Sequence, residues 1–508
     1  MAIGLSRVLG FIRDILMAKL FGTTVQAQAF IVAFRLPNLL RDLVAEGAVT
    51  SAFVPVLSWY RAKGQSEDFW RLSQALLARL LVLLSLIGVI GTLAAPQVVR
   101  VVAPGFVADP EKFSLTVRLA RILFPFITLV GLWAYFMGLL NSLRHFAVPA
   151  LGPAILNVAM ILACLWWAPR ATTGIVALAV SVMIGGAVQL LVQVPVAMRL
   201  GFRWRWRWSH PGSRQILRQL GPRLMGSAVY QVNVLVDTAL ASLSAIVGDG
   251  AVAALYFANR LVQFPLALFG TATAQASLPS LAEQAAHNDL AGFRSTILSV
   301  IRMIGFVILP STVGLIVLAS PIVRGLFQHG AFDQHASLMT SQALAYYALG
   351  LVAFAVSKPL SGAFYALQDT WTPVKLAMEA VAINVVLNLI LMWPMRIAGL
   401  ALASSISNTL NAYRLAKHLE RHLAMPVLQP IADPLLRMMA ASLVMGAGCW
   451  ALSHGVVGGL PPWLGLPAAI VASLALYAAS CRAFRVHELS TILRWLGSPP
   501  LPQASASE

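Results

Sequence analysis

Charge is the property that this chain has least of. Only 11% of its 508 residues are charged, whereas 59% are hydrophobic and the mean hydropathy is +0.80. A soluble domain carries roughly 25% charged residues, so a soluble globular protein is excluded. The long charge-free stretches approach the roughly 20 residues with which a helix crosses a bilayer core of about 30 Å. They are Leu80–Pro96, Ile122–Leu140, Ala147–Ala168, Ala171–Met198, Ile304–Val323, Leu338–Ser357, Ile397–Tyr413 and Gly455–Ser480.

Several other features are scarce or missing. The three cysteines, Cys164, Cys449 and Cys481, are far apart in apolar stretches, so no disulfide framework is implied. The nine histidines are scattered through the chain, and the absence of a GxxxxGK[ST] motif argues against direct use of ATP. The period-two alternation of a membrane barrel is absent, which leaves helices as the way to satisfy the backbone inside lipid. The sequence therefore predicts an all-α polytopic membrane protein.

The hydrophobic pattern predicts about 14 transmembrane helices of roughly 20 or more residues each. Loops rich in Lys and Arg alternate with poor ones, and by the positive-inside rule the rich set is cytoplasmic, which places both termini there. The net charge of +18 is then mostly topological, and nucleic-acid binding is not expected, because no soluble basic domain exists to carry it. No cleavable signal peptide is needed, since the first span can itself direct insertion. The expected spans are approximately 1–21, 26–58, 73–99, 117–143, 147–168, 173–198, 216–246, 250–282, 296–323, 337–366, 373–394, 397–420, 435–454 and 463–484.

Arg and Trp alternate from Arg203 to Trp208, between the sixth and seventh expected spans. These residue types are common at the level of the lipid headgroups, where they anchor a chain to the membrane surface. The composition favours such an anchor and leaves a site for a specific lipid open as the second interpretation.

An internal repeat divides the chain. The stretch Ala52–Leu57 (AFVPVL) reappears 224 residues later as Ala276–Leu281 (ASLPSL), and Gly138, Leu143 and Pro149 match Gly362, Leu367 and Pro373 at the same offset. Six spans fit in that offset, and an even number preserves orientation, so the halves are expected to be parallel repeats around a central cavity. We expect an N-terminal six-helix half at 1–210, a C-terminal six-helix half at 211–430, two additional helices at 431–485 and a cytoplasmic tail at 486–508.

Ionisable residues inside several spans point to a polar cavity, because each costs at least about 2.5–3.5 kcal/mol in lipid. On an ideal helix Arg7 and Asp14 lie about 20° apart, as do Ser6 and Arg13. The second span adds Arg41 and Glu46, and Pro37 with Asn38 is expected to kink that span beside the cavity. The second half contributes Arg260.

Arginine suits a phosphate-binding cavity, because its planar guanidinium binds phosphate through two hydrogen bonds and keeps its charge. We therefore expect Arg7, Arg13, Arg41 and Arg260 to lie close together and away from lipid. The competing interpretation is that these arginines reach the membrane interfaces or pair with the acidic residues as structural ties.

A second group of polar residues contains a negatively charged residue instead of arginines. Asp237 is the acid of the seventh span, Asn384 and Asn388 share one face of the eleventh, and Leu400 and Ser404 of the twelfth offer a carbonyl and a hydroxyl. Oxygen ligands of this kind suit a hard cation. The alternative is an Asp237 that only forms hydrogen bonds between helices.

Two long motifs, SRVLGFIRD at Ser6–Asp14 and FRLPNLLRDLVAEGAVTSAFVP at Phe34–Pro55, resemble the opening signature of the MurJ/MviN family. Shorter similarity continues through APGF at Ala103–Phe106, NRLVQFP, LPSLAEQ and FYALQDTWTPVK, over nearly the whole chain. The family belongs to the MATE-like exporter superfamily, whose two six-helix halves and two extra helices agree with the repeat. One departure is Gln28, where many members have Asp.

The resemblance implies flipping of lipid II, an undecaprenyl-pyrophosphate-linked peptidoglycan precursor, across the bacterial inner membrane without enzymatic chemistry. The family residues that carry over are Ser6, Arg7, Arg13, Arg41, Glu46 and Arg260; together with Asn38 they form the expected substrate site. A monovalent cation such as Na⁺ at Asp237, Asn384, Asn388, Leu400 and Ser404, or the membrane potential, would drive the cycle. Expected partners are lipid II, membrane lipids and the cell-wall synthesis machinery.

Two other functions compete with this interpretation. An ion-coupled drug or solute exporter of the same architecture favours acidic residues in its cavity, and a flippase for another polyprenyl-linked glycan would use the same arginines. A membrane enzyme acting on polyprenyl phosphates would need an Asp-rich or His-bearing loop, and the sequence has none.

Overall fold

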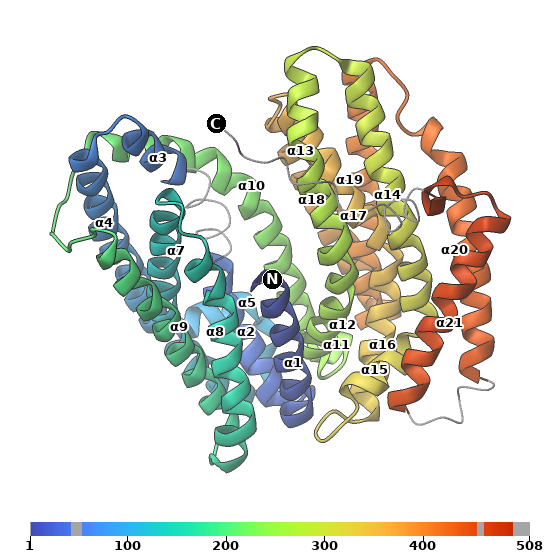
Figure 1. Cartoon of the computed structure of the whole chain (residues 1–508). Coiled ribbons are helices and arrows are strands. Elements are labelled where there is room, and N and C mark those ends of the chain that lie inside the picture. The colour runs from blue at the N-terminus through green and yellow to red at the C-terminus, as the bar shows by residue number, and fades with distance from the viewer. Residues whose placement is uncertain (1, 42–52, 455–461, 491–508) are drawn as a thin grey trace. The chain divides into compact units, whose positions relative to one another are not determined.

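The computed structural model describes residues 2–41, 53–454 and 462–490, and within these ranges all regular structure is helical (Figure 1). The expected all-α membrane fold is confirmed. Each expected span coincides with one helix or with a consecutive pair. From the N-terminus these are α1 (Ala2–Phe21), α2 (Val25–Arg41), α3 (Val54–Ala62), α4 (Ser66–Leu93), α5 (Ala95–Val102), α6 (Pro110–Leu123), α7 (Phe126–Ser142), α8 (Ala147–Leu162), α9 (Gly174–Arg199) and α10 (Pro211–Ala241).

The later helices include the two that follow the repeat. They are α11 (Ser244–Val247), α12 (Ala251–Pro265), α13 (Thr271–Ala286), α14 (Leu290–Val317), α15 (Ala319–Phe327), α16 (Gln334–Leu349), α17 (Leu351–Ala366), α18 (Trp371–Met395), α19 (Ile397–Leu423), α20 (Gln429–His454) and α21 (Pro462–Ala483). Short 3-10 or π turns at Pro104–Ala108, Ala163–Trp167, Ala168–Arg170 and Leu266–Gly270 join or extend them.

Eight helices of the described residues are long and apolar enough to cross a membrane, and the pair α16 and α17, bent by 45°, forms a ninth candidate. The number 14 stays a prediction. Helix α1 carries Arg7, Arg13, Asp14 and Lys19, more charge than a helix surrounded by lipid tolerates. These charges lower the hydropathy of α1.

The chain forms two compact units. The first comprises Met1–Arg260, Leu326–Ala343 and Ala377–Ala403. In it α1 packs beside α8, α8 beside α9, and α2 against α6, as Figure 1 shows for α1, α8 and α9. The unit thus draws on helices of both expected halves, because packing follows contacts in space and not the order of the repeat. The repeat boundaries themselves stay predictions.

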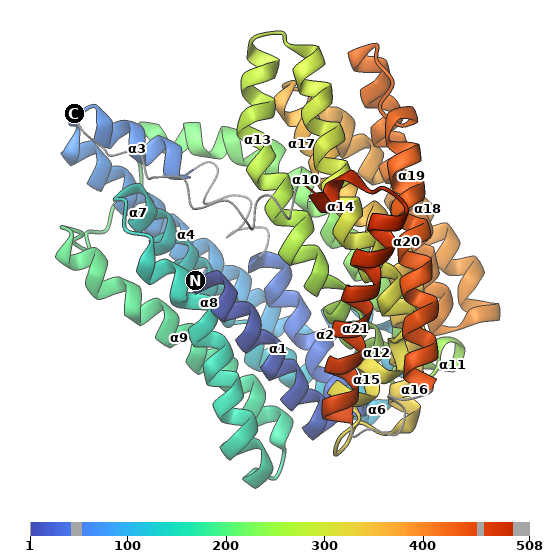
Figure 2. The same ribbon diagram turned by 45° about the vertical axis from the view of Figure 1, so that its right-hand side comes forward.

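The second unit comprises Leu261–Gly325, Leu344–Leu376 and Ser404–Glu508. Helix α14 packs against α13, α17 and α20, and α20 packs along α21 (Figure 2). Phe306 and Tyr477 join α14 to α21, since the Tyr477 hydroxyl donates to the Phe306 carbonyl at 2.8 Å within a shared apolar core. The two helices after the repeat therefore pack on the second unit.

Candidate functional site

Arg13 and Asp14 form a buried ion pair on α1. Their exposed fractions are 7% and 2%, and the Arg13 Nη2 and Nε atoms donate to Asp14 Oδ1 at 2.7 and 3.1 Å. An unpaired charge at such a depth would cost several kcal/mol, and the opposite charge beside it offsets much of that cost. Because adjacent side chains on a helix point about 100° apart, contacts from other helices are needed to hold the two groups together.

Asn157 on α8 holds the other side of Arg13. Arg13 Nη1 donates to Asn157 Oδ1 at 3.0 Å, and Asn157 Nδ2 donates to the Ser6 carbonyl at 3.0 Å. Gly10 faces the same amide, since a Cβ atom there would be in van der Waals contact with Asn157 Nδ2 at 3.4 Å. Ser6 thus enters the site through its backbone carbonyl, and the guanidinium of Arg13 is fixed from two helices.

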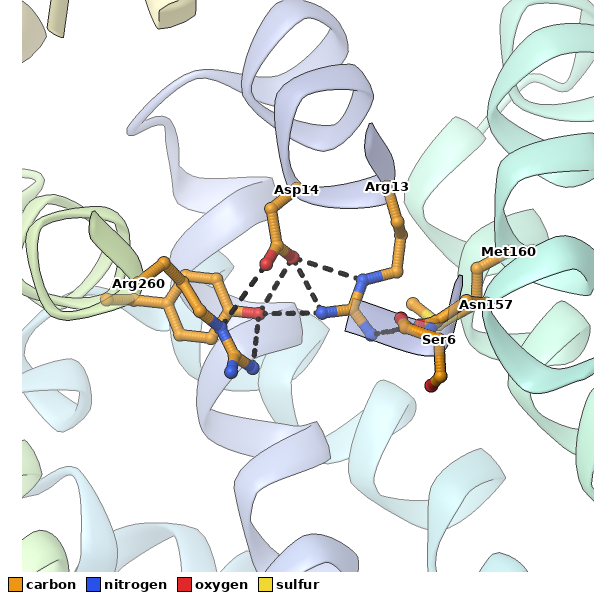
Figure 3. A network of polar contacts seen from close by, with 7 residues as sticks. Ser6, Arg13, Asp14, Asn157, Met160 and Arg260 are labelled. Carbon is orange, nitrogen blue, oxygen red and sulfur yellow. Dashed lines mark hydrogen bonds and ion pairs between the residues drawn. The ribbon is translucent and has the colours of Figure 1, made fainter. Parts of the chain in front are cut away.

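Tyr256 and Arg260, one turn apart on α12, complete the cluster. Figure 3 shows Arg260 beside Asp14 and Arg13. The Tyr256 hydroxyl donates to Asp14 Oδ1 at 3.0 Å and accepts from Arg13 Nη2 at 3.3 Å and Arg260 Nη2 at 3.1 Å. Arg260 Nε lies 3.3 Å from Asp14 Oδ2, and its guanidinium stacks 4.9 Å from the centre of the Tyr256 ring. Sequence analysis missed Tyr256, although its spacing of four residues from Arg260 on one helix is a usable signal.

In the described part of the chain, the guanidinium groups of Arg13 and Arg260 both face the carboxylate of Asp14. The side chains of Asp14 and Arg13 are only 3% and 9% exposed, whereas that of Arg260 is 35% exposed. An anion can therefore approach the cluster at Arg260, and the Arg13–Asp14 pair lies behind it.

The remaining residues of the expected substrate site are placed differently. The side chain of Arg7 is exposed and that of Arg41 is half-buried at the end of α2. Asn38 is half-buried, and among the residues that the structure describes its Oδ1 has no hydrogen-bond partner. Glu46 lies outside the described residues. Arg13 and Arg260 meet through the carboxylate of Asp14 and the hydroxyl of Tyr256.

The second expected group converges around Asp237 on α10. Asn388 Nδ2 donates to Asp237 Oδ1 and to Asn384 Oδ1, at 2.8 Å in both cases, and Asn233 Nδ2 donates to Asp237 Oδ2 at 3.2 Å. The contact between α10 and α18 that this requires is thus present. Leu400 is buried on α19, and Ser404 belongs to the second unit. In the described part of the chain no group of three His, Cys, Asp or Glu residues is arranged for a metal ion.

A third cluster, which we call the latch, joins α2 and α6 to the loop between α11 and α12. Asp249 Oδ1 accepts from Lys112 Nζ at 2.9 Å and from Gln28 Nε2 at 3.3 Å. Lys112 is buried, with its ammonium 4.8 Å from the centre of the Phe106 ring, whereas the Asp249 side chain is 70% exposed. No sequence pattern indicated the latch, because its residues lie in loops or at helix ends far apart in the chain.

Electrostatics favour the ionised form of Asp249. Burial alone would raise the pKa of this carboxyl, but the hydrogen bonds from Lys112 and Gln28, together with the Lys112 charge, outweigh that effect. The pKa of Asp249 therefore lies below its ordinary value, and the latch is charged at neutral pH.

Backbone contacts close the same end of the first unit. Gly22 ends α1 with φ of +52°, and a Cβ atom there would overlap the Ala331 carbonyl. The Ala331 amide donates to the Lys19 carbonyl at 2.9 Å. A Cβ atom at Gly105 would likewise overlap the Ser242 carbonyl, and the Ser242 hydroxyl accepts from the Gly105 amide at 2.9 Å. This end, unlike the region around Arg260, is sealed by direct backbone packing.

Comparison with known proteins decides the family. The family model for "Lipid II flippase MurJ" matches residues 17–460. A lipid II flippase MurJ of Burkholderia cenocepacia is 36% identical over 414 residues, which are 80% of this chain and 80% of that protein. A probable lipid II flippase MurJ of Vibrio cholerae is 37% identical over 464 residues, covering 88% of this chain and 87% of the relative. The chain belongs to the lipid II flippase MurJ family.

Solved structures agree in fold with this MurJ membership. A structure of "Lipid II flippase MurJ, inward closed conformation" superposes with a TM-score of 0.80 at 24% identity, covering 97% of this chain and 98% of the other. An inward-facing multidrug resistance MATE family transporter of the MOP superfamily superposes with a TM-score of 0.71 at 14% identity, over 82% and 94%. The fold of this MurJ family member is therefore also that of the MATE-like exporters.

Proposed function

We propose that this chain is a lipid II flippase, which moves an undecaprenyl-pyrophosphate-linked glycopeptide from the cytoplasmic to the periplasmic leaflet. The proposal rests on one observation within the family assignment: in the described part of the chain Arg13 and Arg260 both face the carboxylate of Asp14, and the side chain of Arg260 is 35% exposed. The pyrophosphate is the costly part of the cargo to bring across lipid, whereas the polyprenyl tail can stay among acyl chains. A cationic cluster in mid-membrane supports this task.

Asp14 would make binding reversible. An arriving pyrophosphate competes with Asp14 for Arg260, and hydrogen bonds to charged groups are worth about 1.5–3 kcal/mol each. When Arg260 turns to the phosphate, Asp14 keeps its bonds with Arg13 and Tyr256, so no buried charge is left without a partner. After release, Arg260 pairs with Asp14 again. This competition keeps the affinity for the pyrophosphate low enough for the cargo to leave.

Transport also requires that access alternate between the two sides of the membrane. In this proposal the latch of Gln28, Lys112 and Asp249 and the packing of Gly22 on Ala331 close the periplasmic side while the cargo enters. Release needs these contacts to break and others to form on the cytoplasmic side. The protein does no covalent chemistry on its cargo; binding and conformational change are its whole task.

The return step needs a source of free energy, which we propose is the membrane potential or a monovalent cation bound at Asp237. Each charge moved is worth about 2.3 kcal/mol per 100 mV. The oxygen-rich donor set of Asp237, Asn384 and Asn388 suits a hard cation such as Na⁺. Asn388, however, directs its amide nitrogen at both neighbours, so its amide would have to turn over to offer an oxygen.

The test is complementation of a flippase-depleted bacterium combined with a lipid II translocation assay on spheroplasts. We expect the chain to restore growth and the appearance of lipid II on the periplasmic face. Growth without translocation, or translocation only of another polyprenyl-linked glycan, would reject lipid II as the cargo. Export of a cationic drug with no effect on lipid II would favour the exporter alternative. Tags placed at both termini should be accessible only from the cytoplasm, which would check that both termini lie on the cytoplasmic side of the inner membrane.

A further inference from the structure

The segment Arg203–Trp208, which we call the Arg-Trp strip, connects α9 to α10 and is fixed at both ends. Before it, Phe202 is buried between Trp70 and Phe136, with ring centres 6.3 and 5.5 Å away. After it, His210 packs edge-on against Tyr60 at 5.5 Å and caps α10 by accepting from the Gly212 amide. A segment held at both ends has a defined path, so its side chains have defined positions on the surface.

The backbone of the strip is bound to α4. Gln74 Nε2 donates to the Arg203 carbonyl at 2.8 Å, and Arg79 Nε donates to the Trp208 carbonyl at 2.6 Å. Between these two bonds the chain has no helix or turn, and successive side chains of an extended segment point to opposite faces. Two carbonyls of the strip are thus bound by α4, and its side chains are exposed except that of Arg207, which is half-buried.

The two kinds of side chain separate onto two faces. Trp206 lies 6.4 Å from Trp204 and 5.3 Å from Trp208 between ring centres, which places the three indoles in one row. Their exposed fractions are 56%, 48% and 53% for Trp204, Trp206 and Trp208. Among the residues that the structure describes, Arg203, Arg205 and Arg207 form no ion pair, and at about 6.5 Å between alternate residues they make a row of three positive charges.

The strip lies where α4 changes from a packed to an exposed apolar surface. Arg79, which binds the Trp208 carbonyl, is followed on α4 by exposed Leu83, Leu86 and Ile90, the surface that acyl chains would cover. Helix α9 ends at Arg199, four residues before the strip. Indole rings are favoured at the boundary between headgroups and acyl chains. A segment of Arg and Trp at the border of such an apolar surface suits the level of the lipid phosphates.

We infer that the Arg-Trp strip is a binding site for anionic phospholipids, with the three guanidinium groups on their phosphates and the indoles inserted at the level of the glycerol backbone. Charge complementarity selects this occupant, since each Arg near an anionic membrane surface contributes about 1 kcal/mol to the attraction. The inference is independent of transport, because none of these residues belongs to the arginine cluster of α1 and α12.

The test uses the full chain in phosphatidylcholine vesicles that contain a small fraction of dibrominated phosphatidylglycerol or dibrominated phosphatidylcholine. Bromine quenches nearby indoles, and the signal of the strip is the difference between the wild type and W204F/W206F/W208F. We expect stronger quenching by the brominated phosphatidylglycerol. R203Q/R205Q/R207Q should reduce the preference for the anionic lipid by about 100-fold, and Arg205→Gln alone by about fivefold.

The control R421Q/R482Q/R485Q removes three exposed arginines of the second unit and changes the net charge equally. It should keep the preference, as should R203K/R205K/R207K, which keeps the charge at the strip. Equal quenching by both lipids in the wild type would overturn the inference. So would an equal loss in the control, or displacement of the brominated phosphatidylglycerol by one equivalent of a polyprenyl pyrophosphate, which would make the strip a site for the cargo.

Discussion

Arg260 Nε lies 3.3 Å from Asp14 Oδ2, although one residue is on the first helix and the other lies beyond the middle of the chain. Asp14 simultaneously accepts from Arg13 and from the Tyr256 hydroxyl. One carboxylate therefore organises two arginines that come from different halves of the sequence. Removal of the Asp14 carboxylate should affect folding and transport in different ways, and separate measurements distinguish the two effects.

Asp14→Asn should destabilise the protein more than Arg260→Gln does. The first change leaves the buried Arg13 without its counter-charge, and breaking a buried pair in this way costs about 3–5 kcal/mol. The second removes a guanidinium that is one-third exposed, so water compensates for part of the loss. Thermal unfolding of both purified variants in the same detergent measures the order. Equal losses would mean that the cluster is not organised around Asp14.

Arg13→Ala and Arg41→Ala should abolish complementation of a flippase-depleted strain at near-normal protein levels. The Lys substitutions should rescue only in part, because a point charge cannot replace the two parallel hydrogen bonds of a guanidinium. Growth curves with quantitative immunoblots are the measurement. Full growth of both Ala variants would remove these residues from transport, and loss of the folded protein would make their charges structural.

Tyr256→Phe should slow lipid II translocation several-fold without changing protein level. The ring and its stacking on Arg260 remain, while the hydroxyl that links Asp14, Arg13 and Arg260 is lost. One net hydrogen bond is worth about 0.5–1.5 kcal/mol, or up to about tenfold in rate. Phe257→Tyr, about 100° round the helix on its packed face, serves as a control for perturbation of α12. Translocation at the wild-type rate in Tyr256→Phe would show that the hydroxyl has no role.

Gln28→Asp should weaken the latch in this chain, although many relatives have Asp at the corresponding position. Asp249 already supplies the carboxylate, so a second one 3.3 Å from it repels it. The double variant Gln28→Asp with Asp249→Asn restores one acid and one amide and should recover closure. Accessibility of a cysteine at Thr23 to a membrane-impermeant reagent reports opening. If the double variant is no better than the single one, the two residues are not coupled.

The latch should not respond to pH between about 5 and 8. The pKa of Asp249 is lowered from its ordinary value of about 3.9, so its contribution is complete above that value. It is lost only as the pH falls through the lowered pKa. The same cysteine assay across this range tests the point, with Asp249→Asn as the control that lacks the titrating group. A transition near pH 6 in the wild type alone would contradict the assignment.

The sequence by itself determined the membrane fold and the residues that bear charge inside it. Long apolar runs require helices, because lipid cannot satisfy a backbone, and an Arg or Asp in such a run requires a polar environment. Arg13, Asp14 and Arg260 could be singled out on that basis, and the period of the α-helix placed Asn384 and Asn388 on one face.

Tertiary structure decided which of these residues meet. Packing of α12 beside α1 joined Arg260 to Asp14 and added Tyr256, whose hydroxyl carries no charge to mark it in the sequence. Lys112 and Asp249 belong to separate parts of the chain, and only the fold brings them together as an ion pair. Local patterns fix the helices and the energetic cost of their charges, but a partner distant in the chain is chosen by the arrangement of helices, which no single stretch of sequence encodes.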